Sequence, residues 1–172
     1  MNKCILLGAV PVIPLFAGSC AGDPAASVPE NARPNVIFIF SDDLGIGDLS
    51  CYGATKVVTP NIDRLAAQGQ RFINAYATSA TSTPSRFGLL TGMYPWRLPN
   101  TQIAPGNSEL IIDTECHTLA DAMHDAGYVT GAVGKWHLGL GPVGGTDFNV
   151  EIRPDARDIG FDYEYLIPAT VD

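Results

Sequence analysis

One segment restricts the fold more than any other: the apolar run over residues 35–41 (NVIFIFS), which ends abruptly at Asp42 and Asp43. Most of its residues are β-branched or aromatic and do not alternate with polar ones, which is typical of a strand buried on both faces. Strands of that kind occur in parallel sheets that helices cover on both sides. The run therefore predicts a strand of a mostly parallel sheet.

The segments that follow alternate between helical and extended patterns. Helices are expected at three places, each marked by a capping residue or an early proline: 59–69, 82–92 and 118–126. Further strands are expected at two places: 70–78 and 128–133. This order predicts an α/β fold, a three-layer sandwich with a mostly parallel sheet. Beyond Leu138 the pattern weakens, and we expect a long loop there.

Composition excludes several classes of protein. The 172 residues suit one domain, and with 46% hydrophobic and 16% charged residues they indicate a globular chain. A net charge of −8 argues against a non-specific nucleic-acid binder, which needs a basic surface. The body of the chain has no apolar stretch long enough for a transmembrane helix.

The first residues resemble a bacterial secretory signal. Lys3 is followed by a short apolar run and then by small residues before Cys20. We expect a signal peptide over 1–19 of the lipoprotein type, with Cys20 as the first mature residue, and a flexible tether over 20–34. The protein would then lie in the bacterial periplasm or cell envelope, where a lipid at Cys20 is its one contact with a membrane. The alternative is ordinary cleavage a few residues later, which leaves a soluble periplasmic or secreted protein.

Two candidate sites lie near the first strand and the second helix. Asp42 and Asp43 follow a predicted strand, and ligands of α/β sheets bind at such carboxyl ends. Their carboxylates could hold a hard cation such as Ca²⁺ or Mg²⁺, or they could simply form a solvated turn. Ser82 to Arg86 enter a helix, whose free N–H groups and nearby guanidinium suit an anion. The alternative is a plain serine cap with Arg86 on a solvated face.

A third candidate site follows the strand expected at 128–133. Lys135 and His137 would share a face if the strand continued, because side chains alternate along a strand with period two. One residue is a permanent cation and the other a titratable imidazole. Each is more often a surface or satisfied core residue when it stands alone. The three sites together indicate hydrolysis or transfer of a phosphate or sulfate ester.

These residues stand in four ordered blocks that resemble the N-terminal part of the type I sulfatases, members of the alkaline-phosphatase-like superfamily. The blocks are RPNVIFIFSDDLG from Arg33, TPNIDRLAAQG from Thr59, NAYATSATSTPSRFGLLTG from Asn74 and GKWHLG from Gly134. The central motif is Cys or Ser, any residue, Pro, any residue, Arg, and it spans Ser82 to Arg86. The resemblance implies a sulfuric ester hydrolase that acts on a sulfated glycan or an aryl sulfate.

The resemblance also implies a role for each candidate residue. A maturase would oxidise Ser82 to formylglycine, and the hydrate of that aldehyde would be the nucleophile. Asp42, Asp43 and the modified Ser82 would ligate Ca²⁺ or Mg²⁺. Arg86 would hold the hydrate.

By the same resemblance, Lys135 and His137 would contact the sulfate and the hydrate. The glycine-rich and acidic segment over 139–162 is expected to line the sugar-binding side. Sulfated carbohydrate and the maturase would be the partners, and nucleic acid would not.

The chain is shorter than the family pattern. Residues 35–172 would be the N-terminal portion of a catalytic domain, without the further metal ligands, and we expect that portion to be inactive alone. Two alternatives stay open. One is a phosphonate monoester or phosphodiester hydrolase of the same superfamily, and the other is a non-catalytic glycan-binding protein of the envelope.

Overall fold

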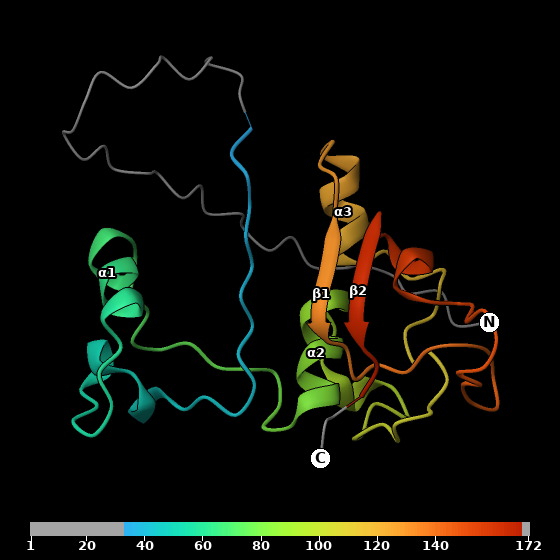
Figure 1. Ribbon diagram of the computed structural model, residues 1–172, viewed down its shortest axis with the longest axis horizontal. Helices are drawn as coiled ribbons and strands as arrows, with labels where there is room; N and C mark the ends of the chain where they lie inside the picture. The colour runs from blue at the N-terminus through green and yellow to red at the C-terminus, as the bar shows by residue number, and fades with distance from the viewer. Residues whose placement is uncertain (1–32, 170–172) are drawn as a thin grey trace. The chain divides into compact units, whose positions relative to one another are not determined.

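The computed structural model of the protein describes residues 33–169 (Figure 1). The predicted signal peptide over 1–19, and the tether as far as residue 32, lie outside these residues. Within the described part, no helix is long and apolar enough to cross a membrane. The chain divides between Ala75 and Tyr76 into two compact units.

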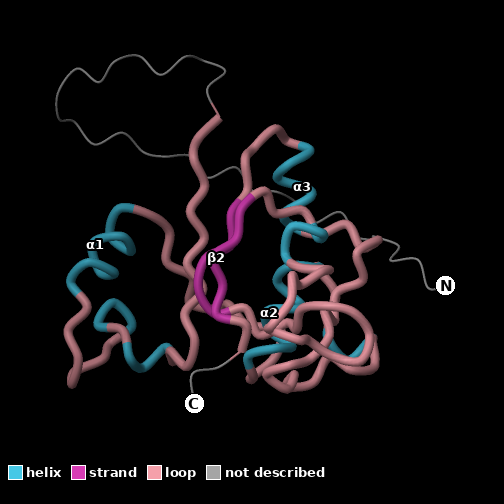
Figure 2. Tube along the Cα trace, turned by 45° about the vertical axis from the view of Figure 1, so that its right-hand side comes forward, coloured by secondary structure: helices cyan, strands magenta, loops and turns pink. Residues whose placement is uncertain are grey.

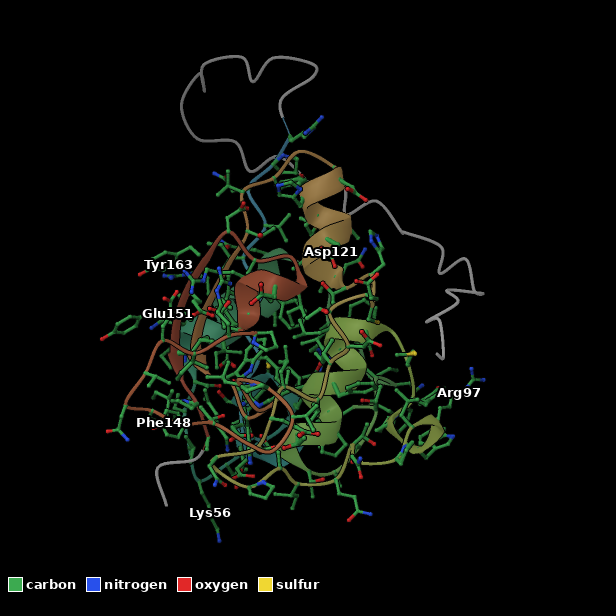
Figure 3. All side chains as sticks on the ribbon, turned by 90° about the vertical axis from the view of Figure 1, so that its right-hand side faces the viewer. Lys56, Arg97, Asp121, Phe148, Glu151 and Tyr163 are labelled. Carbon is green, nitrogen blue, oxygen red and sulfur yellow. The ribbon has the colours of Figure 1, made fainter. Side chains whose placement is uncertain are left out.

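The unit that begins at Tyr76 contains the sheet. Strand β1 (Gly131–Lys135) pairs in parallel with strand β2 (Tyr163–Ile167), with Gly131 opposite Tyr163 and Lys135 opposite Ile167. The helices α2 (Ser82–Thr91) and α3 (Leu119–Asp125) lie on one side of these two strands (Figures 1 and 2). Tyr163 points away from both helices (Figure 3). The predicted α/β class with a parallel sheet is therefore confirmed.

The core of this unit fills the space between sheet and helices. Its buried members come from α2, from the segment before α3, and from the chain after β1: Phe87, Ile112, Cys116, Trp136, Leu138, Leu140, Ala156 and Ile159. Ala132 and Leu166 pack on this cluster from the inner face of the sheet. Burying such side chains is the main favourable contribution to folding.

The segment after Leu138, predicted as a long loop, is more ordered than we expected. It contains a short 3-10 helix (Ala156–Ile159) and then β2. Asp155 is buried there and paired with Arg153 and Arg157. Burial alone would raise the pKa of Asp155, but the hydrogen bonds and charges of these arginines hold it below its usual value. The sequence pattern missed β2 because the strand has only five residues and follows a run of acidic ones.

The other unit forms around α1 (Pro60–Gln68) and two short 3-10 helices, Ile46–Asp48 and Ser50–Tyr52. As predicted, α1 begins at the early proline and ends before Gly69; Thr59 occupies the N-cap position without a side-chain capping bond. The carboxylate of Asp63 accepts hydrogen bonds from the Ser50 hydroxyl at 2.6 Å and the Cys51 N–H at 2.8 Å. These bonds, the Ser50 hydroxyl first, hold the pKa of Asp63 below its usual value.

Three strand predictions need correction. The structure assigns no strand over 35–41 or over 70–78, and Ile37 and Ile39 are 85% and 79% exposed. A strand needs a hydrogen-bonded neighbour, and no described residue between 33 and 75 forms a strand that could pair with these segments. The third predicted strand, 128–133, is observed three residues later, as β1. The N–H of Thr130 binds the Asp162 carboxylate at 2.8 Å, so the ladder starts only at Gly131.

Candidate active site

Arg86 connects the start of α2 to the end of β1. Its Nε donates to the Ser82 Oγ at 2.9 Å, which the spacing of four residues along a helix allows. Its Nη1 donates to the backbone carbonyl of Lys135 at 2.6 Å. Ser82 is the first residue of α2 and Lys135 the last of β1. A half-buried guanidinium therefore holds the Ser82 hydroxyl at the carboxyl end of β1.

His137 is buried, and one nitrogen of its ring has no hydrogen-bond partner among the described residues. Only 4% of the residue is exposed, and its Nε2 lies 3.0 Å from the carbonyl oxygen of Ala104. A carbonyl oxygen can only accept, so the Nε2 carries the proton. In the tautomer with its proton on Nε2, the Nδ1 is an acceptor, and it has no partner among the residues that the structure describes. A buried acceptor of this kind is costly unless a ligand or a water satisfies it.

The period-two argument for Lys135 and His137 does not apply to the structure. The strand ends at Lys135, and His137 adopts φ 55°, in the left-handed region. The backbone N–H of His137 still donates to the carbonyl of Pro168 at 2.9 Å. Backbone hydrogen bonds that continue past Lys135, and not alternation along a continuous strand, therefore hold His137 at the carboxyl end of β1.

Thr83 ties these parts together, and sequence reasoning did not single it out. Its buried hydroxyl donates to the carbonyl of His137 at 2.8 Å and accepts from the N–H of Ala104 at 3.1 Å. It thereby joins α2, the segment around Ala104 and the end of β1. Thr83 stands at a position where the motif admits any residue, and the sequence contains no signal for Ala104. Only the tertiary contact identifies them.

The structure thus links Ser82, Arg86 and the backbone of Lys135 and His137 by hydrogen bonds within one unit, through Arg86 and Thr83. A helix N-terminus, a guanidinium and a buried imidazole acceptor suit an anionic group with oxygen atoms. Asp42 and Asp43 belong to the other unit, where both are exposed. Asp43 adopts φ 53°, a left-handed conformation that Asp tolerates better than most residues.

The expected metal site is not complete among the described residues. Within 33–169, no group of three or more His, Cys, Asp or Glu side chains is placed to hold a metal ion. Asp42 and Asp43 offer the carboxylate oxygens that a hard divalent cation prefers. The donor chemistry fits such a cation, and the two residues would supply part of a ligand set.

Comparisons with known proteins point to one family. The sequence model of the sulfatase family matches residues 34–163. An N-acetylgalactosamine-6-O-sulfatase of Bacteroides thetaiotaomicron is 69% identical over 171 residues, which make up 99% of this chain and 34% of that protein. Human arylsulfatase A is 44% identical over 123 residues, which make up 70% of this chain and 24% of that protein.

A solved structure from work on the metabolism of multiple glycosaminoglycans by Bacteroides thetaiotaomicron has the same fold. Its TM-score is 0.80 at 78% identity, over 81% of this chain and 29% of that one. The chain therefore spans between 24% and 34% of the length of these three relatives.

Proposed function

This chain belongs to the sulfatase family, and on that premise we propose that it hydrolyses a sulfate ester on an N-acetylhexosamine of a glycan. The sugar is supported by the relative that is 69% identical, an N-acetylgalactosamine-6-O-sulfatase. The observation that carries the proposal is that hydrogen bonds of Arg86 and Thr83 connect Ser82 to the segment of His137, whose buried Nδ1 has no partner among the described residues.

We propose that Ser82 is the residue that a maturase converts to formylglycine. One hydroxyl of the hydrated aldehyde would attack sulfur and release the sugar alcohol. The other hydroxyl would then lose its proton, so that the aldehyde reforms and sulfate leaves, an exit that a serine sulfate lacks. Arg86 holds the side chain at position 82 through its Nε and offsets negative charge beside it. The Nδ1 of His137 accepts a proton or a hydrogen bond from the group bound there, because the Nε2 proton is held by Ala104. Lys135 adds a second positive charge for the sulfate.

Asp42 and Asp43 are proposed to donate oxygen ligands to a divalent cation, Ca²⁺ or Mg²⁺. Two adjacent carboxylates support this proposal by their chemistry. When bound, such a cation offsets the negative charge of the sulfate oxygens.

The test uses the protein at its full natural length, isolated from its own host, so that maturation has taken place and any part of the catalytic domain beyond residue 172 is present. We expect release of sulfate from 6-O-sulfated N-acetylgalactosamine, and a peptide spanning Ser82 that is lighter by two hydrogen atoms. The variant Ser82→Ala should show neither, while Ser79→Ala, a nearby serine outside the motif, should keep the activity. Hydrolysis of phosphonate esters but not of the sulfated sugar would overturn the proposal in favour of the related hydrolases.

A further inference from the structure

A cavity with a volume of about 460 Å³ lies beside the Ser82 cluster, within the same unit. Its walls come from two segments, one before α3 and one after β1: Asn100, Gln102, Ile103, Ala104, Pro105, Asn107, Ser108, Glu109, Ile111, Gly144 and Gly145. Ala104 belongs to both sites, because it lines the cavity and its carbonyl contacts the Nε2 of His137. Ala104 therefore connects the wall of the cavity to the ring of His137.

The walls of the cavity are held by backbone contacts between the two segments. The N–H of Gly144 donates to the Glu109 carboxylate at 2.8 Å, and the N–H of Thr146 to the carbonyl of Asn107 at 2.8 Å. Gly145 has φ 107°, and a Cβ there would lie 2.8 Å from the carbonyl oxygen of Asn107. The glycine-rich loop therefore approaches the other wall more closely than a larger residue would allow.

The chemistry of the lining is polar and lacks positive charge. Side-chain amides of Asn100, Gln102 and Asn107 offer donors and acceptors that suit hydroxyl and acetamido groups of a sugar. Of the described residues that line the cavity, none is Lys, Arg or His, and the only charge is the carboxylate of Glu109. A neutral sugar ring is well accommodated there, whereas a second sulfate or a uronate meets repulsion from Glu109.

We propose that this cavity binds the uncharged ring of the sulfated sugar and that Glu109 makes the site selective for rings with a single sulfate. This inference rests on the proposed function and adds a specificity-determining residue to it. The variant Glu109→Gln is a sharp test. Its amide oxygen can still accept the hydrogen bond from Gly144, so the change removes the charge and retains the contact.

The experiment measures binding, and so it does not depend on turnover. The protein carries Ser82→Ala, and calorimetry compares N-acetylgalactosamine with one sulfate at O6 and the same sugar with a second sulfate on the ring. We expect tighter binding of the singly sulfated sugar. Glu109→Gln should reduce the ratio of the two dissociation constants about fivefold, because it removes one nearby charge. The matched control is Glu115→Gln, an exposed carboxylate outside the cavity lining, which should leave the ratio unchanged.

Three results would overturn the inference. Equal binding of the two sugars by the Ser82→Ala protein would show that the cavity does not discriminate. The same ratio of dissociation constants for Glu109→Gln and Glu115→Gln would show that Glu109 does not determine the preference for the singly sulfated sugar. If neither sugar binds, the cavity is not a sugar site. The proposed function is judged separately, because it fails only if the matured protein releases no sulfate from the singly sulfated sugar.

Discussion

At the scale of single residues, two hydrogen-bonded side chains account for most of the candidate site's geometry. Arg86 places the Ser82 hydroxyl, and Thr83 places His137 and Ala104. Arg86 bonds one side chain and one backbone carbonyl, and Thr83 bonds a backbone carbonyl and a backbone N–H, so the site is tied to the fold at several points. Arg86 was expected from its motif, but Thr83 was not, because a contact across 54 positions leaves no trace in local sequence.

Removal of the Thr83 hydroxyl should destabilise the protein. Thr83→Val keeps the shape but leaves the N–H of Ala104 and the carbonyl of His137 buried without this partner. A cost of about 1–3 kcal/mol in the free energy of unfolding is expected for such groups. Urea unfolding would measure it, with Thr114→Val, at an exposed position, as the control. If both variants unfold at the same urea concentration as the unchanged protein, the hydroxyl does not contribute in this way.

At the scale of elements, a side chain from the turn before β2 sets where β1 begins. The Asp162 carboxylate accepts from the Thr130 N–H at 2.8 Å and from the Thr130 hydroxyl at 3.0 Å. These bonds, the backbone N–H first, hold the pKa of Asp162 below its usual value of 3.8. The strands thereby acquire a common start, with Gly131 opposite Tyr163.

The lowered pKa of Asp162 predicts a pH dependence of stability. A carboxylate with a lower pKa in the folded state stabilises the fold above the unfolded-state pKa, near 3.8, and this contribution is lost as the pH falls through the folded-state value. Asp162→Asn should therefore lower the stability of the protein at neutral pH. On acidification, the variant should lose less stability than the unchanged protein.

The measurement is the urea midpoint between neutral pH and pH values below 3.8, with Asp113→Asn, an exposed site, as the control. Parallel pH curves for the unchanged protein and for Asp162→Asn would contradict the assignment.

At the scale of the whole molecule, close approach between distant segments decides the shape of the candidate site. The segment 108–111 exchanges backbone hydrogen bonds with 138–141, for example from the N–H of Ile111 to the carbonyl of Leu138 at 3.0 Å. Gly139 stands within this contact at φ 68°, and a Cβ there would lie 1.7 Å from the carbonyl oxygen of Glu109. Only glycine fits, for reasons of both backbone conformation and space.

Gly139→Ala should consequently be among the most damaging single substitutions. We expect a loss of roughly 2–4 kcal/mol in the free energy of unfolding, because a left-handed conformation and a steric overlap both oppose the methyl group. The control Gly92→Ala has nearly the same φ, 66°, but nothing within 4 Å of the new methyl, so it isolates the backbone cost. Equal losses for the two variants in thermal or urea unfolding would rule out the overlap.

Local sequence determined the features of this protein that depend on neighbours along the chain. The cap Thr118, the helix start at Pro60 and the placement of Ser82 and Arg86 one turn apart on a helix are of this kind, because capping and helical spacing are local. The resemblance of the four sequence blocks to the sulfatase family is also a property of the local sequence.

Only the tertiary structure decided what depends on partners far along the chain. Apolar content predicted strands over 35–41 and 70–78 that the structure does not form, because a strand exists only with a hydrogen-bonded neighbour. The link from Thr83 to His137, the buried Nδ1 and the cavity beside Glu109 also required the fold. Long-range contacts of this kind depend on which segments pack together, and no local pattern encodes that choice.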